Sequence, residues 1–289
     1  MNYPKSKIYH DGSHYIAIPR AEVKNKKRKS HVPNKTLNEK IETILDKNKN
    51  KTKQERIDIA IKTISDEIKN EKLATELVNK NIERIKRNVI ERRKRLSRKA
   101  HIQQWNYFCT FTYDSTKLTA DEFREKFSNC IKHLASRKKW KYIGVWEKSP
   151  EKQRLHFHGL FYIPQMVGEL IETRDYSTTK HQMQITMQNT FFLERFGRND
   201  FREIPPIKEI LTQSINYLMK YIQKTGERIV YSKGVGTYFV SDILGSDVVC
   251  TIGQEDKKLL LFDDFMCFID GELIGTVSDE VISRMPKEN

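Results

Sequence analysis

Residues 36–103 contain neither glycine nor proline, so this stretch lacks the two residue types that most often interrupt regular structure. Isoleucine also recurs at helical spacing within it, at Ile57, Ile59, Ile61, Ile64 and Ile68. We therefore predict a helical extension over residues 36–103. Residues 1–35 are expected to be irregular, apart from a possible small hairpin around Asp11-Gly12.

From Trp105 onward the chain is rich in β-branched and aromatic segments, which are typical of strands. Strands are expected over residues 107–114, 141–147, 155–164 and 200–204. Helices are expected after Thr119, which fits a capping box with Glu122, and over residues 207–224. Residues 165–189 are polar and poorly patterned, so we expect a long excursion there. This order predicts an α+β fold, with an antiparallel sheet and helices packed on one of its faces.

Short strand-like segments return after Gly226 and continue to the end of the chain. The sequence is therefore divided into four parts: residues 1–35, the helical extension 36–103, a sheet domain 104–230 and a β-rich C-terminal extension 231–289.

Basic residues are concentrated at the start of the chain. The first 100 residues carry 28 of the 53 Lys and Arg residues but only 13 of the 38 Asp and Glu residues, so the whole formal charge of +15 lies there. Such a balance attracts a polyanion, and nucleic acid is the expected partner. The candidate phosphate contacts are Arg92, Arg93, Lys94, Arg95, Arg98 and Lys99. The alternative is a helix whose charges are simply solvated.

Four cysteines are present, at positions 109, 130, 250 and 267, and no two have the close spacing of a zinc-binding pair. No apolar run approaches the roughly 20 residues that a membrane span needs. The N-terminus also lacks the apolar core of a signal peptide. A soluble protein in a reducing, cytoplasmic compartment is expected.

The segment "RLHFHGLFYI" places two histidines, His156 and His158, on one predicted strand. Side chains alternate along a strand, so both point to the same face, about 6.5–7 Å apart. If Glu147 on the preceding strand lies opposite His156, all three share that face. Two imidazoles and one carboxylate form a plausible metal site, but a register shift by one residue would remove Glu147 from it.

The segment "YLMKYIQK" carries two tyrosines, each followed three residues later by a lysine. Tyr217, Lys220, Tyr221 and Lys224 fall within an arc of about 100° on a helix. The apolar stripe of the same helix lies on another arc, so we expect the tyrosines to face away from that core. A lysine near a tyrosine favours the phenolate and can bind a phosphate oxygen, which suits cleavage of a phosphodiester by tyrosine.

Three motifs together, "FCTFTY", "HFH" preceded by Glu147, and "YLMKYIQK", resemble those of the HUH endonucleases. The double tyrosine-lysine pattern is most similar to rolling-circle replication initiators of the phage gene A and gene II types. The resemblance covers roughly residues 85–235. It implies an RRM-like antiparallel sheet of about five strands.

The same resemblance implies the roles of the site residues. His156, His158 and Glu147 become ligands of Mg²⁺ or Mn²⁺, Tyr217 and Tyr221 nucleophiles, and Lys220 and Lys224 their supports. The implied reaction nicks single-stranded origin DNA, near a hairpin, leaving a 5′-phosphotyrosine link and a free 3′-hydroxyl primer. A bacterial host cytoplasm is the implied location.

Absent motifs narrow the choice. No Gly-x-x-x-x-Gly-Lys-Ser/Thr is present, so no P-loop helicase and no nucleotide cofactor are expected, and unwinding falls to a host helicase that works with a host DNA polymerase. Relaxases usually carry a third metal-binding histidine near the pair. The next histidine here is His181, in the expected excursion, so the pattern favours an initiator over a relaxase.

Three other readings stay open: an HUH-type transposase with the same chemistry, a noncatalytic RRM-like nucleic-acid-binding protein that stacks bases on "YFCTFTY", and a zinc hydrolase.

Overall fold

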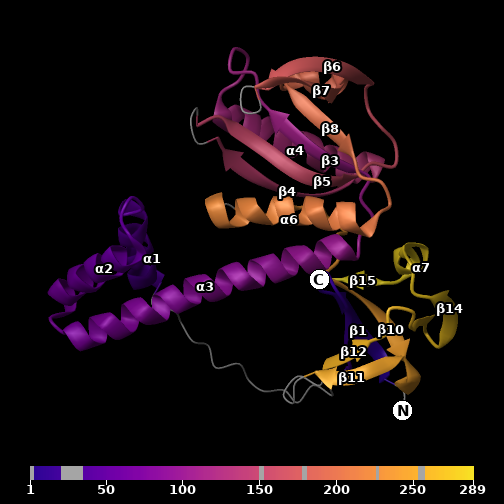
Figure 1. Ribbon diagram of the computed structural model, residues 1–289, viewed down its shortest axis with the longest axis horizontal. Coiled ribbons are helices and arrows are strands. Elements are labelled where there is room, and N and C mark those ends of the chain that lie inside the picture. Colours follow the sequence, from indigo (N-terminus) through magenta and orange to yellow (C-terminus); the bar gives the residue numbers. More distant parts are fainter. Residues whose placement is uncertain (1–2, 21–34, 150–152, 178–180, 226–227, 253–257) are drawn as a thin grey trace. The chain divides into compact units, whose positions relative to one another are not determined.

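The computed structural model describes residues 3–20, 35–149, 153–177, 181–225, 228–252 and 258–289 (Figure 1). The chain divides into two compact units. One unit contains residues 22–92, and the other contains residues 1–21 and 93–289. Helix α3 (Glu71–His101) contributes residues to both.

The described part of the first unit, residues 35–92, is helical, as predicted. It contains α1 (Lys35–Lys47), α2 (Lys53–Ile68) and the first part of α3. Thr52 and Glu55 form a capping box that fixes the start of α2. Its core is a small apolar cluster: Ile41, Leu45, Ala60, Ile64, Ala74 and Val78. Helical spacing of apolar residues therefore does indicate the buried stripe here.

The second unit contains a five-stranded antiparallel sheet with the order β8-β3-β5-β4-β9. Its strands are β3 (Tyr107–Thr112), β4 (Lys141–Lys148), β5 (Leu155–Tyr162), β8 (Asn199–Glu203) and β9 (Val230–Tyr231). Two main helices accompany them, α4 (Ala120–Lys138) and α6 (Lys208–Thr225). The α+β class and an antiparallel sheet of about five strands are thus confirmed.

Helices cover both faces of this sheet, so the expectation that they pack on one face is wrong (Figure 1). Helix α4 packs on the face that carries Phe111 and Phe157. Helix α6 packs on the opposite face, against Val145 and Leu160. The physical reason is that the central strands are apolar at both odd and even positions, and both faces must therefore be shielded from water.

A second, six-stranded sheet joins the two ends of the chain, with the order β11-β12-β2-β1-β10-β15. Its strands are β1 (Tyr3–His10), β2 (Tyr15–Ile18), β10 (Tyr238–Ile243), β11 (Val248–Ile252), β12 (Lys258–Leu261) and β15 (Lys287–Glu288). The predicted hairpin around Asp11-Gly12 is confirmed, since β1 and β2 pair on either side of it. Gly12 adopts φ +110°, a conformation that favours glycine.

Residues 165–189 are more ordered than expected. They form the hairpin of β6 (Leu170–Ser177) and β7 (Gln182–Asn189), paired from Leu170↔Asn189 to Ser177↔Gln182. In β7, Met183, Ile185 and Met187 alternate with polar residues, which is a strand pattern, but β6 shows no such alternation and the segment as a whole is polar. The strands β13 (Met266–Ile269) and β14 (Glu272–Thr276) lie among the strand-like segments expected after Gly226. The short helices α5 (Thr190–Arg195) and α7 (Asp279–Arg284) and the 3-10 turn η1 (Gly245–Asp247) were not expected.

His10 is a buried histidine of this unit. Its side chain is buried at the end of β1, stacked on His101 with ring centroids 5.0 Å apart, and its Nδ1 accepts a hydrogen bond from the Gly12 N–H. Burial lowers the pKa of His10 to about 4, and the neighbouring His101 and Lys208 contribute to this shift. The neutral ring is therefore the form that folds.

We expect the free energy of unfolding to decrease as the pH falls from 6.5 toward 4, because the unfolded chain binds the proton that folded His10 excludes. His10 alone should lower the free energy of unfolding by about 2 kcal/mol at most between about pH 7 and pH 5. His10→Gln should flatten the pH dependence of urea unfolding. An equal slope in wild type and His10→Gln would contradict this origin of the acid sensitivity.

Candidate functional site

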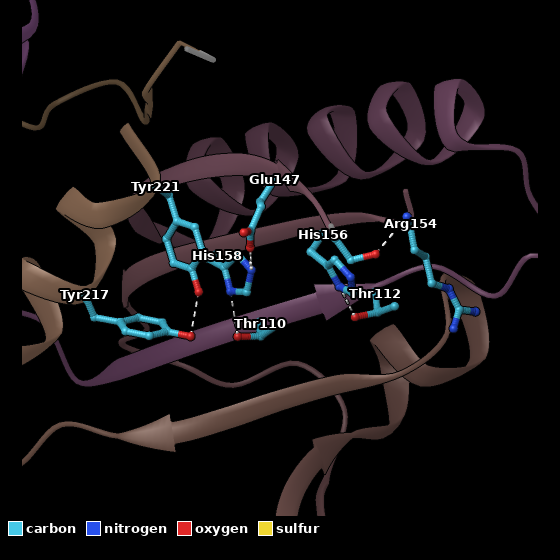
Figure 2. Close-up of polar contacts among 9 residues, drawn as sticks. Thr110, Thr112, Glu147, Arg154, His156, His158, Tyr217 and Tyr221 are labelled. Carbon is cyan, nitrogen blue, oxygen red and sulfur yellow. Dashed lines mark hydrogen bonds and ion pairs between the residues drawn. The ribbon is translucent and has the colours of Figure 1, made fainter. Parts of the chain in front are cut away.

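The pairing of β4 with β5 sets the geometry of the candidate metal ligands. Glu147 lies directly opposite His156, which is the register that the sequence analysis assumed. His158, two residues further along β5, points to the same face. Its Nε2 lies 3.1 Å from Glu147 Oε2, and both side chains are nearly buried (Figure 2). The three side chains therefore share one face of the sheet.

Two threonines of β3 hold the histidine rings, a pair of contacts that the sequence analysis did not identify. Thr110 Oγ1 lies 3.1 Å from His158 Nδ1, and Thr112 Oγ1 lies 2.7 Å from His156 Nδ1 (Figure 2). Metal-binding histidines usually have their second ring nitrogen held in this way, which leaves Nε2 for the ion. The signal in the sequence was the alternation of "TFT" on a strand next to "HFH".

The donor set fits a divalent cation in its chemistry. Burial lowers the pKa of His156 to about 4, with a further contribution from His158, so this ring is neutral at neutral pH, as a ligand must be. The side chains are not drawn together into a closed cluster: across the described ranges, no group of three or more His, Cys, Asp or Glu is placed to hold a metal ion. The rings of His156 and His158 lie 6.0 Å apart. The contact already formed is the pair Glu147–His158.

Helix α6 places its two tyrosines beside this pair. The Tyr221 ring stacks on the His158 ring, with centroids 4.6 Å apart and planes at 4°. The Tyr221 hydroxyl donates a hydrogen bond of 2.5 Å to the Tyr217 hydroxyl (Figure 2). Tyr217 is 45% exposed, whereas Tyr221 is 8% exposed. The two hydroxyls thus differ sharply in access to a large substrate.

The expectation that both tyrosines face away from the apolar core is therefore wrong for Tyr221. Tyr221 belongs to the cluster that includes Ile215 and Leu218, between α6 and the sheet. The buried arc of α6 is wider than the aliphatic stripe because the helix also covers the polar His158. Burial, together with the hydrogen bond to Tyr217, raises the pKa of Tyr221.

The structure describes the side chain of only one of the two lysines of the motif. Lys220 is an exposed residue of α6. Lys224 is part of α6, but its side chain lies outside the described part of the structure. The roles expected for both lysines stay predictions.

The basic residues of α3 are placed in two different ways. Lys94 and Arg95 are exposed, and Arg92 and Arg93 are partly exposed. The Arg98 guanidinium lies over the ring of Tyr9, 4.1 Å from its centroid.

The expectation that Lys99 contacts phosphate is wrong, because its side chain is buried and its ammonium group is hydrogen-bonded within the protein. Lys99 is 6% exposed and donates hydrogen bonds to the Val235 carbonyl at 2.6 Å and to Asn289 Oδ1 at 2.5 Å. Burial lowers its pKa to about 8. Because these contacts lie inside the unit of residues 1–21 and 93–289, Lys99 fixes the C-terminal end of the chain rather than a ligand.

Comparison with known proteins adds one match. Residues 106–226, a little over two fifths of the chain, match the family described as replication-associated protein ORF2/gene 2 protein. This segment contains β3 to α6, and therefore both histidines, Glu147 and both tyrosines. The match supports a family of replication initiators, whose members would bind DNA. No curated protein and no solved structure matches the chain. Among the helices in the described ranges, none is long and apolar enough to span a membrane.

Proposed function

We propose that this protein is a rolling-circle replication initiator of the HUH type, which nicks single-stranded origin DNA by tyrosine attack. The observation that carries the proposal is the contact chain Tyr217–Tyr221–His158–Glu147, in which two phenols adjoin a histidine-carboxylate pair. The match of this same segment to the replication-associated family supports it. No other group of side chains that we describe combines nucleophile and ligand types in this way.

Tyr217 is the first nucleophile in this proposal. Its hydroxyl belongs to the exposed tyrosine, so a DNA backbone can reach it, and it accepts a hydrogen bond from Tyr221. That hydrogen bond stabilises the phenolate that forms as Tyr217 loses its proton. The phenol proton passes to solvent water as the phenolic oxygen bonds to phosphorus. The bond from phosphorus to the 3′ oxygen breaks, and that oxygen takes up a proton from water. The products are a 5′-phosphotyrosine link and a free 3′-hydroxyl.

Tyr221 is suited to a second role. It is held against His158 and shares a hydrogen bond with Tyr217, so it reaches a phosphate only when Tyr217 is displaced. A second attack by Tyr221 would end a replication cycle, after Tyr217 has become linked to DNA.

His156, His158 and Glu147 would hold Mg²⁺ or Mn²⁺. When bound there, such an ion supplies positive charge that polarises the scissile phosphate. Thr110 and Thr112 would hold the two rings, and His158 Nε2 and Glu147 Oε2, which now contact each other, would turn to the ion.

The noncatalytic alternative is disfavoured by the position of the aromatic strand. Phe111 is buried under α4, and Phe108 lies under α6 with its ring 5.5 Å from that of Tyr217. Neither ring is available as a platform for bases. A transposase would share the nicking chemistry; the paired tyrosines favour the initiator.

The proposal is tested with the single-stranded form of the DNA element that encodes this protein. In Mn²⁺, we expect a protein-DNA adduct that survives a denaturing gel and carries the DNA by its 5′ end. The adduct should disappear when EDTA is present. A free 5′ end on the cleaved DNA, or cleavage that EDTA does not affect, would contradict the proposal.

A further inference from the structure

A groove of about 610 Å³ lies between α4 and α5, and basic side chains are prominent in its lining. Its lining includes Lys126, His133, Arg137, Lys138, Arg195 and Phe191. The first three follow one face of α4, because His133 lies seven residues after Lys126 and Arg137 lies four residues after His133. The groove therefore runs along that helix for roughly 18 Å, at 1.5 Å per residue.

The positive charge of the groove is largely uncompensated. The lining contains no Asp or Glu. Lys126 lies 3.6 Å from Glu122, but within the described residues no carboxylate is in ion-pair distance of Arg137 or Lys138. These two cations are also compatible with the C-terminal dipole of α4, but Arg195 comes from a different helix and is unrelated to that dipole. The three cations converge on one hollow.

An aromatic ring accompanies this charge. Phe191 is half-buried in the wall of the groove, and the Arg195 guanidinium lies over its ring, 4.2 Å from the centroid. Cationic grooves with aromatic or guanidinium planes are the usual means by which proteins hold single-stranded nucleic acid without reading its sequence.

The groove lies on the sheet face opposite the tyrosines. Residues on the inner side of α4, such as Phe123 and Phe127, pack on the face of Phe111, whereas His158 and Tyr221 belong to the other face. The groove is therefore separate from the proposed nicking site.

A basic edge connects the two faces. Arg195 in the groove and Arg198 lie on either side of Gly197, at the turn between α5 and β8. The Arg198 carbonyl accepts a hydrogen bond of 2.8 Å from the N–H of Thr112, whose hydroxyl contacts His156, so Arg198 borders the candidate site. A strand leaving the site past Arg198 would meet Arg195 next.

We propose that the groove between α4 and α5 is a second DNA-binding surface, which holds a segment of single-stranded DNA away from the nicking site. Its partner is the sugar-phosphate backbone, contacted by Arg137, Lys138 and Arg195, with a base against the Phe191–Arg195 pair. This inference rests on the proposed function for the identity of the nucleic acid as DNA, but not on the nicking chemistry.

The test measures binding of fluorescein-labelled oligo(dT) to the full-length protein by fluorescence anisotropy, with EDTA present so that no cleavage occurs. The groove variant is Arg137→Gln with Lys138→Gln. The matched control is Lys132→Gln with Lys139→Gln, two exposed cations, one in the second half of α4 and the other its C-cap, that do not line the groove. Both variants lose two positive charges from α4 and its C-cap.

Each backbone contact contributes a slope of about 0.7 in the logarithm of affinity against the logarithm of salt concentration. The groove variant, which loses two contacts, should therefore show a drop in affinity between about 50 and 200 mM salt that is about sevenfold smaller than that of wild type. The control variant should behave as wild type. Phe191→Leu should weaken binding of oligo(dT) but not of a duplex of the same length.

Equal effects of the two double variants would overturn the proposal, because charge alone would then explain the binding. A groove variant that loses affinity for the duplex but not for oligo(dT) would also overturn it. Failure of the nicking proposal would be visible separately, as loss of the covalent adduct in wild type with unchanged anisotropy results.

Discussion

Tyr217→Phe is expected to slow the cleavage of single-stranded DNA by roughly 10³- to 10⁶-fold, the range typical when a covalent nucleophile is removed. The substitution removes the oxygen that bonds to phosphorus and keeps the ring that packs near Phe108. Tyr221→Phe is the matched control on the same helix. It should slow the first cleavage only about tenfold, because Tyr217 loses one hydrogen bond of about 1–1.5 kcal/mol.

The measurement is the single-turnover rate of cleavage at saturating DNA, with folding checked by circular dichroism. The reverse order, with Tyr221→Phe inactive and Tyr217→Phe active, would show that the buried tyrosine attacks first. In that case α6 must move away from His158 before chemistry, since the two rings are now stacked.

Glu147→Gln is expected to weaken Mn²⁺ binding by at least about 100-fold, more than is typical for a residue that only orients a metal ligand. The substitution removes the negative charge on this face of the sheet and keeps the shape and a hydrogen bond to His158. Mn²⁺ affinity can be measured by electron paramagnetic resonance without DNA. Cleavage should fall in parallel and recover in part at high Mn²⁺ concentration.

Glu209→Gln is the control for this loss of charge, since Glu209 is an exposed residue in the first turn of α6. Mn²⁺ affinity that is the same in wild type and in Glu147→Gln would remove Glu147 from the ligand set. The two histidines would then have to be tested as ligands without it.

Much of the sheet could be predicted because its strands are short aromatic runs bounded by turn residues. The pairing of Glu147 with His156 was only assumed from the sequence, which left a shift by one residue open, and the register of β4 and β5 confirms it. The alternation of side chains on a strand was then enough to place His156 and His158 on one face.

Other features depend on tertiary packing that a local pattern does not contain. Helix α6 covers the second face of the sheet because both faces are apolar. This packing buries Tyr221 between α6 and the sheet. Lys99 is buried because the segment before β10 and the chain terminus pack around α3, which charge counting along the helix does not reveal. The hairpin β6–β7 was missed because only β7 alternates apolar and polar residues, and the polar sequence of β6 did not mark a partner strand.

The basic groove between α4 and α5 is another feature that the sequence did not predict. Residues 101–289 carry equal numbers of acidic and basic residues, so the overall charge gave no reason to expect a cationic surface there. The cationic surface forms because Arg137 and Lys138 of α4 line the same groove as Arg195. The acidic residues of α4 lie near the start of the helix, away from these cations. Local charge at the scale of a helix face, rather than the net charge of a domain, determines where a polyanion can bind.

The most direct test of the account is to identify the residue that becomes linked to DNA. Trypsin separates the two tyrosines, because cleavage after Lys208, Lys220 and Lys224 places Tyr217 in residues 209–220 and Tyr221 in residues 221–224. Wild-type protein is incubated with the single-stranded element and Mn²⁺, digested with trypsin and nuclease, and analysed by mass spectrometry. We predict a nucleotide attached through its 5′-phosphate to Tyr217 in the peptide of residues 209–220. A nucleotide on a peptide that contains neither tyrosine, or no linked nucleotide at all, would contradict the central claim.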